Sequence, residues 1–177
     1  MHYLFSISLF LSALLLFIIQ PMVAKAMLPA YGGTPMVWTV CMLFFQALLL
    51  VAYAYAWLLS KFQRHWHWRI LHALLAVASL LMLPLVFSPD TSIHAPEQSI
   101  LYGLLTQLGL PLLIIGASAP LLQYAYSQTS AKRAADPYFL YVASNIGSLL
   151  ALLGYPWLVE RYIKLSTQFK IWSIGYE

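Results

Sequence analysis

The sequence predicts an all-α fold, a polytopic transmembrane helix bundle with five complete spans and the start of a sixth. Only 8 % of the 177 residues are charged, whereas 62 % are hydrophobic. The few charges fall in clusters that separate long uncharged runs. A water-soluble domain of this length needs a more polar surface, so the composition places the chain in lipid. Alternation with a period of two is absent, which favours helices over membrane strands.

Each uncharged run is long enough to cross about 30 Å of hydrocarbon as a helix, which takes roughly 20 residues. Because lipid offers the backbone no hydrogen-bond partners, each run is expected to be helical. We expect spans over residues 3–27, 34–60, 69–88, 98–124 and 137–159, and a partial span over 167–177. Residues 1–177 then form one transmembrane domain. The incomplete last span predicts that the chain is the N-terminal fragment of a longer protein.

The end of the first span carries polar and helix-breaking residues. Pro21 has no N–H, so it frees a carbonyl in the preceding turn and favours a kink. Lys25 follows closely, where its long side chain can reach the outer interface. The alternative is a buried charge that lines a pocket together with Gln20. Ala24–Ala26 has the form of a signal-peptide cleavage site, but no Lys or Arg precedes the apolar run, which favours a retained span.

Amide side chains and prolines mark the interior of the other spans. Gln46, Gln107 and Asn145 lie within the second, fourth and fifth runs, where an amide can join two helices or contact a solute. In the fourth run, Pro111 and Pro120 each free a carbonyl. Such breaks occur both as plain kinks and as the interrupted helices of transporter binding sites. We therefore consider Lys25, Gln46, Gln107 and Asn145 as candidate cavity-lining residues.

The fifth span has the clearest packing signal. Asp136 is expected to cap its N-terminus, with Pro137 at the first helical position. Small residues then recur every fourth position, which allows another helix to approach closely. This helix-packing stripe consists of Ala143, Gly147 and Ala151.

The basic residues indicate how the bundle is oriented. Most of them lie in the second and fourth loops, at Lys61, Arg64, Arg69, Lys132 and Arg133, whereas the third loop holds Asp90 and Glu97 and no base. The positive-inside rule then places the N-terminus in the cytoplasm. Arg161, Lys164 and Lys170 in the fifth loop oppose this orientation.

Several kinds of site are excluded by composition. Cys41 is the only cysteine, so neither a disulfide framework nor a paired-cysteine metal site is possible. His65 and His67 stand in a basic, Trp-rich loop that suits lipid headgroups better than a metal. The net charge of +4 is spread over loops and gives no sign of nucleic-acid binding. No phosphate-binding glycine loop or catalytic set is visible, so we expect no catalytic residues, no metal and no cofactor in this chain.

Three blocks of sequence carry a family resemblance. The first comprises Gln20–Lys25, Leu28-Pro29, Gly32–Pro35, Val37-Trp38 and Phe44–Leu50; the second Asp136–Tyr141 and Ser144–Ser148; the third Gln168–Trp172 and Gly175-Tyr176. With these blocks, the chain resembles the N-terminal membrane region of bacterial spermidine-synthase-like polytopic membrane proteins. The resemblance implies a multi-pass protein of the bacterial inner membrane. In that family the membrane region precedes a soluble, Rossmann-like domain similar to aminopropyltransferases, whose nucleotide loop and acidic polyamine contacts have no counterpart here.

Two functions follow as expectations. The first is an integral membrane module of a spermidine-synthase-like protein, embedded in the lipid bilayer and partnered by a separate or downstream soluble domain. The residues that the resemblance carries over are Lys25, Gln46, Asp136, Asn145 and Gly147, without assigned roles. The alternative is a transporter-like or permease-like bundle for a small polar solute; a polyamine fits poorly, because no acidic residue lies within a predicted span. A non-functional remnant of a broken gene is a third possibility.

Overall fold

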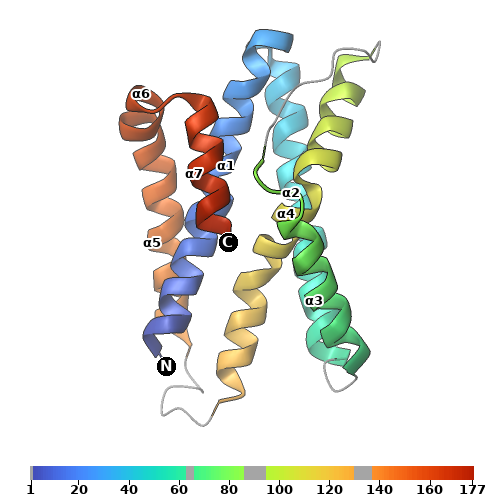
Figure 1. The fold of residues 1–177 in the computed structure, drawn as a ribbon. Helices are drawn as coiled ribbons and strands as arrows, with labels where there is room; N and C mark the ends of the chain where they lie inside the picture. Colours follow the sequence, from blue (N-terminus) through green and yellow to red (C-terminus); the bar gives the residue numbers. More distant parts are fainter. Residues whose placement is uncertain (1, 63–65, 86–94, 130–136) are drawn as a thin grey trace.

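Long helices account for most of the structure, a computed structural model that describes residues 2–62, 66–85, 95–129 and 137–177. No strand occurs in these residues, which confirms the all-α prediction. In chain order the elements are α1 (His2–Tyr31), α2 (Pro35–Phe62), α3 (Trp66–Leu80), α4 (Pro96–Ser127), α5 (Tyr138–Gly154), the π-helical segment η1 (Tyr155–Val159), α6 (Glu160–Tyr162) and α7 (Leu165–Tyr176) (Figure 1).

Local sequence explains where the helices begin and end. α1 ends because Gly32 adopts a φ of 71°, a left-handed conformation that suits glycine, and donates its N–H to the Leu28 carbonyl. α4 begins with Pro96, whose missing N–H has no partner to lose at a helix start. α5 starts at Tyr138 with Pro137 as its N-cap, one residue later than expected, and Asp136 lies outside the described residues.

Four of the described helical stretches are long and apolar enough to cross a membrane: residues 3–31, 35–62, 96–127 and 138–162. They correspond to the first, second, fourth and fifth predicted spans. α4 runs through both of its internal prolines without interruption. Its prolines therefore break no helix, contrary to the interrupted arrangement considered from the sequence.

The prediction of a complete third span over residues 69–88 is wrong. α3 has 15 residues, about 22 Å at 1.5 Å per residue, too short for roughly 30 Å of hydrocarbon. It ends at Leu80, four residues before Pro84. Proline disfavours helical geometry in the residue before it and cannot donate to the helix, which explains an early end in an apolar run.

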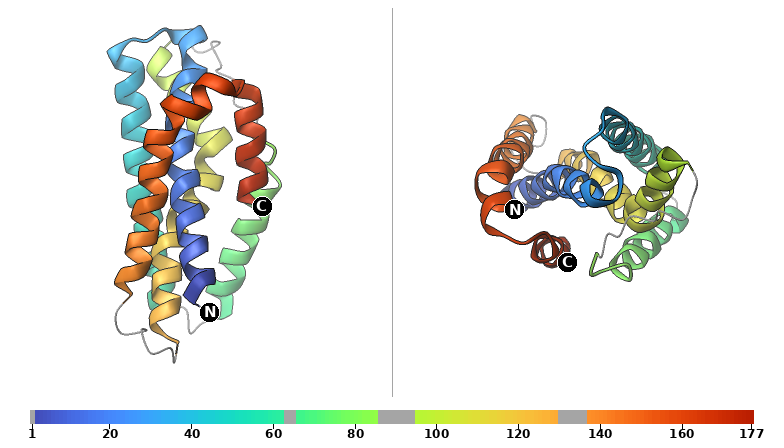
Figure 2. Two further views of the ribbon diagram at one scale, coloured as in Figure 1. Left: turned by 90° about the vertical axis from the view of Figure 1, so that its left-hand side faces the viewer. Right: turned by 90° about the horizontal axis from the view of Figure 1, so that it is seen from above.

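α1 and α4 are the inner helices of the bundle. Half of the most apolar stretch of α4 and 39 % of that of α1 are buried, against 22 % for α2 and 17 % for α5. α1 packs against α5, α4, α7 and α2, while α2 and α3 pack on α4. Seen from above, α1 and α4 occupy the middle and the other helices surround them (Figure 2).

Two short helices, α3 and α7, approach the middle of the bundle from opposite ends (Figure 1). Their ends are joined by hydrogen bonds between side chains and backbone. The Ser79 hydroxyl lies 2.8 Å from the Tyr176 hydroxyl, which donates to the Pro111 carbonyl of α4 at 3.2 Å. The backbone N–H of Leu85 donates to Ser173 Oγ at 2.9 Å. Both α3 and α7 end inside the bundle. These contacts give hydrogen-bond partners to the Leu85 N–H and to the hydroxyls of Ser79 and Tyr176, which lipid could not supply.

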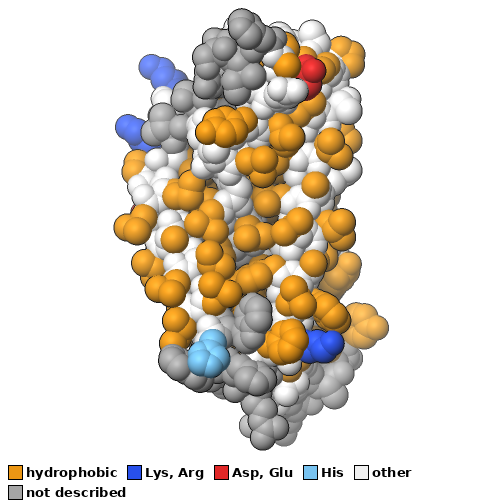
Figure 3. Space-filling model, turned by 90° about the vertical axis from the view of Figure 1, so that its right-hand side faces the viewer, with side chains coloured by type: hydrophobic (Ala, Val, Ile, Leu, Met, Phe, Trp, Pro, Cys, Tyr) orange, Lys and Arg blue, Asp and Glu red, His pale blue; other side chains and the backbone are white. Residues whose placement is uncertain are grey.

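The outer surface has the layering of a membrane protein. Figure 3 shows a face on which hydrophobic side chains cover the middle of the bundle and charged side chains lie near its two ends. Large apolar side chains point outward from several helices, among them Leu50, Leu74, Leu149 and Leu153. An apolar surface of this extent is unfavourable in water, so the fold suits a lipid environment.

Candidate functional site in the upper half of the bundle

A cavity of about 660 Å³ lies between α1, α2 and the stretch from α5 to α6. It is lined on α1 by Leu16, Phe17, Gln20, Pro21, Ala24, Lys25 and Leu28, on α2 by Trp38, Cys41, Met42, Phe45, Gln46, Leu48 and Leu49, on α4 by Leu112, and beyond these by Leu152, Tyr155, Pro156 and Glu160. The lining residues of α1 cover about 18 Å of helix. The cavity thus extends from near the middle of α1 toward its C-terminal end.

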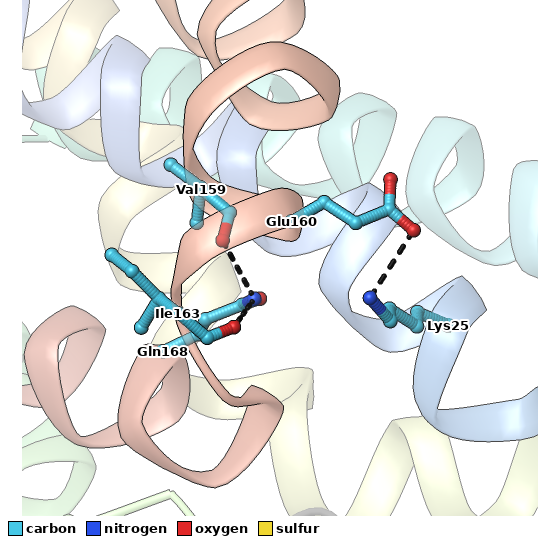
Figure 4. Close-up of polar contacts among 5 residues, drawn as sticks. All are labelled: Lys25, Val159, Glu160, Ile163 and Gln168. Carbon is cyan, nitrogen blue, oxygen red and sulfur yellow. Dashed lines mark hydrogen bonds and ion pairs between the residues drawn. The ribbon is translucent and has the colours of Figure 1, made fainter.

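An ion pair stands in the upper part of this cavity. Lys25 Nζ lies 3.2 Å from Glu160 Oε1 (Figure 4). The side chains are 34 % and 43 % exposed, so both charges are partly buried and each is neutralised by the other. The structure therefore places Lys25 in a paired, cavity-lining position rather than as an isolated interfacial charge.

A π turn brings Glu160 to the cavity. The N–H of Glu160 bonds to the carbonyl of Tyr155, five residues back. In a regular α-helix at about 100° per residue, residues five apart point about 140° away from each other. A π turn contains one more residue, so Tyr155 and Glu160 lie nearly above each other. Pro156 lies within this segment, and its ring disfavours regular α-geometry against the carbonyl of Leu152, four residues earlier.

Polar groups other than the ion pair lie lower in the cavity. Gln20 and Gln46 both line it, and Gln20 Nε2 donates to the Leu16 carbonyl of its own helix at 3.4 Å. The Tyr155 side chain is 3 % exposed, and its hydroxyl has no hydrogen-bond partner among the described residues. The cavity thus combines an ion pair, two amides and one unsatisfied hydroxyl with mostly apolar walls.

The same turn region is closed by Gln168 of α7. Its Nε2 donates to the carbonyls of Ile163 at 2.8 Å and Val159 at 3.3 Å (Figure 4). The Val159 carbonyl also accepts from the Ile163 N–H at 3.0 Å, whereas the Ile163 carbonyl lies just past the end of α6, where carbonyls lack intrahelical partners. Gln168 therefore holds the segment that carries Glu160.

The structure brings together only two of the four candidate cavity-lining residues. Lys25 and Gln46 line the same cavity. Gln107 is half-buried on α4 and Asn145 is exposed on α5, and neither lines it.

The helix-packing stripe of α5 faces α1. Ala151 and Gly147 are buried and Ala143 is half-buried. A Cβ added at Gly147 would collide with the carbonyl oxygen of Phe10 and would lie 3.3 Å from the Leu14 nitrogen. The backbones of α1 and α5 are thus in direct contact at Gly147.

Sequence reasoning missed Glu160, Tyr155 and Trp38 as site residues. Glu160 directly follows the uncharged run that ends at Val159, so it falls just outside the predicted span. The useful signal was Pro156 inside the fifth run, because an intrahelical proline calls for a kink or a widened turn that changes which residues share a face.

A second cavity of about 540 Å³ lies in the other half of the bundle. Its lining includes Ser8 and Ser12 of α1, Ser60 of α2, His72 of α3 and Ser118 of α4. The two cavities therefore border different stretches of the same central helix, α1.

The fold and the first cavity define a class, an all-helical bundle with membrane-capable helices around a partly polar internal cavity. Among the described residues, no group of three or more His, Cys, Asp or Glu side chains could hold a metal ion. Comparison of the chain with protein-family models, curated proteins and solved structures gave no match.

Proposed function

We propose that this chain is the integral membrane module of a spermidine-synthase-like protein, and that it holds a small ligand in the cavity at Lys25 and Glu160. One observation carries the proposal. More than half of the residues that line the cavity belong to the first block of the family resemblance, namely Gln20, Pro21, Ala24, Lys25, Leu28, Trp38, Phe45, Gln46, Leu48 and Leu49. The first block thus supplies most of the cavity wall, which supports a ligand site there.

The proposed location is the bacterial inner membrane, with the N-terminus in the cytoplasm. The start of α1, the end of α2, the start of α3, the end of α4 and the start of α5 lie at one end of the bundle (Figure 1). The basic clusters of the second and fourth loops adjoin this end in the sequence, which supports a cytoplasmic assignment by the positive-inside rule. Reporter fusions after Phe62 and after Ser127 test it, and reporters active on the outer side of the membrane at both positions would overturn it.

The proposed link to a synthase-like domain is tested by reading the DNA that surrounds the gene for this chain. We expect a soluble aminopropyltransferase-like domain in frame after Glu177 or in a neighbouring gene. Co-purification of that domain with this chain from detergent extracts is the second measurement. If neither position encodes such a domain, the family assignment fails.

A transporter-like bundle is the second candidate function. The observation that favours it is the pair of cavities, which border upper and lower stretches of α1. Transporters expose one central site to the two sides of the membrane in turn, and two cavities toward opposite ends of one helix would suit the two access paths. The continuous α4 speaks against a broken-helix mechanism of the kind considered from the sequence.

Uptake into reconstituted vesicles separates the two candidates, with labelled leucine and labelled spermidine as probes. A transporter predicts that Gln46→Leu lowers uptake of the accepted probe. Asn145→Leu is the matched control, because Asn145 is an exposed amide outside the cavity. Equal uptake by protein-containing and empty vesicles would exclude transport of these solutes.

A further inference from the structure

The ligand class of the cavity follows first from Tyr155. Its side chain lines the cavity and is almost fully buried. Its hydroxyl has no partner in the part of the chain that the structure describes. Buried hydroxyls are normally hydrogen-bonded, and an unpaired one is unfavourable. Because the hydroxyl oxygen is itself buried, it must turn toward the cavity to meet a ligand, and a ligand with a hydrogen-bond acceptor there would gain both a new bond and relief of that penalty.

The charges of the cavity limit the net charge of the ligand. Glu160 and Lys25 are the only charged side chains among the described lining residues, and they neutralise each other. A ligand with one net charge would pair with one partner and leave the other exposed to an apolar site, which is unfavourable. A head group that carries both an ammonium and an acidic group can engage both without this penalty.

The size of the cavity suits a small molecule. Its volume of about 660 Å³ lies within the range of about 300–1,000 Å³ typical of ligand pockets.

The position of the cavity points to the bilayer as the source of the ligand. α2 and α5 both pack on α1 and share no extensive interface with each other. In the view from above in Figure 2, α2 and α5 stand apart from each other on the same side of α1. The cavity is therefore bordered by two helices whose outer faces suit lipid, and an amphiphile can reach it from the membrane.

We propose that the cavity binds a membrane amphiphile of no net charge, with a zwitterionic head at Lys25 and Glu160 and a hydrogen-bond acceptor at Tyr155. The apolar part lies against the aromatic and aliphatic walls formed by α1 and α2. This inference deepens the proposed function and rests on it only in taking the chain to be embedded in lipid.

Binding to the purified chain in detergent micelles tests the proposal, measured by native mass spectrometry. The probes share one acyl length: lysophosphatidylethanolamine as the zwitterion, lysophosphatidylglycerol as the anion and an alkylamine as the cation. Leucine serves as a soluble zwitterion without a long tail. We expect the zwitterionic amphiphile to bind at least about tenfold more tightly than the other probes.

Variants assign the binding to this cavity. Tyr155→Phe removes only the hydroxyl and should weaken binding of the zwitterion about five- to tenfold, as expected for one hydrogen bond. Tyr162→Phe is the matched control, since Tyr162 is 73 % exposed and lies outside the cavity; it should bind as the parent does. The double variant Lys25→Gln with Glu160→Gln should bring the three amphiphiles to within about twofold of one another.

The outcomes are distinct. Equal binding of all three amphiphiles by the parent, or binding unaffected by Tyr155→Phe, would show non-specific lipid adhesion and overturn the proposal. Tight binding of leucine would assign the cavity to a free solute. Thermal stability of each variant, measured in parallel, separates lost binding from lost folding. These binding measurements need no synthase-like domain. Their result therefore does not depend on whether such a domain is encoded after Glu177 or in a neighbouring gene.

Discussion

The ammonium of Lys25 and the carboxylate of Glu160 lie 3.2 Å apart, although they stand near opposite ends of the sequence. Two features of the fold set this distance. Contact between Gly147 and the backbone of α1 fixes how α5 lies along α1. The π turn at Tyr155–Val159 then rotates Glu160 toward the cavity. Each feature can be tested separately.

Removing one partner of the ion pair should destabilise the protein more than removing both. Lys25→Met leaves a partly buried carboxylate without its counter-charge. We expect a loss of about 1–2 kcal/mol, between the values for exposed and buried pairs. The double variant with Glu160→Gln should recover part of this loss in thermal unfolding in detergent. Additive losses would contradict a direct interaction.

Replacing Pro156 should separate Lys25 from Glu160. Pro156→Ala restores the backbone N–H and removes the ring clash, which favours regular α-geometry and turns Glu160 away from the cavity. The measurement is cross-linking of Lys25→Cys to Glu160→Cys with a short bifunctional reagent, in a Cys41→Ser background. The yield should fall with Pro156→Ala and stay unchanged with Pro96→Ala, an exposed proline at the start of α4 that lies outside the cavity. Equal yields would mean that Pro156 does not set the turn.

Gly147 should be intolerant of any side chain. Gly147→Ala introduces a Cβ that collides with the Phe10 carbonyl, and overpacking of this kind costs about 1–3 kcal/mol. Gly147→Leu should cost more and disrupt the contact between α1 and α5. Gly154→Ala in the same helix is the control, because its Cβ meets no atom within 4 Å. The two alanine variants should differ clearly in melting temperature, and equal melting would refute the close contact.

Docking of α7 should depend on the indole nitrogen of Trp172. This side chain is 2 % exposed, and its Nε1 donates to the Leu15 carbonyl of α1 at 2.8 Å. Trp172→Phe keeps an aromatic ring but loses the donor and part of the packed volume, for a loss of about 1–3 kcal/mol. Trp157→Phe should be nearly neutral, since Trp157 is 79 % exposed. Limited proteolysis around Lys164 should be faster only in the Trp172 variant.

The four long helices were predictable from the sequence because a long uncharged run has few stable alternatives in lipid. The same rule failed for residues 69–88. Hydropathy does not distinguish a complete span from a short helix whose polar groups near the end are bonded to Ser173 and Tyr176. Those partners come from α7, and their positions depend on tertiary packing.

The candidate site was only partly predictable for a related reason. Lys25 and Gln46 stood out because polar groups are costly in lipid. Gln107 and Asn145 satisfied the same criterion but lie elsewhere, since the criterion identifies polar groups without saying which face they occupy. Glu160 was missed because the periodicity of 3.6 residues does not anticipate a π turn.

The meeting of α3 with α7 has a consequence for biosynthesis. Leu85 finds its hydrogen-bond partner Ser173 only 88 residues later in the chain. At roughly 5–20 residues per second, the ribosome needs about 4–18 s to produce that partner. During this interval the Leu85 N–H lacks the Ser173 hydroxyl that it later contacts, so the junction between α3 and α7 can close only after α7 has been synthesised.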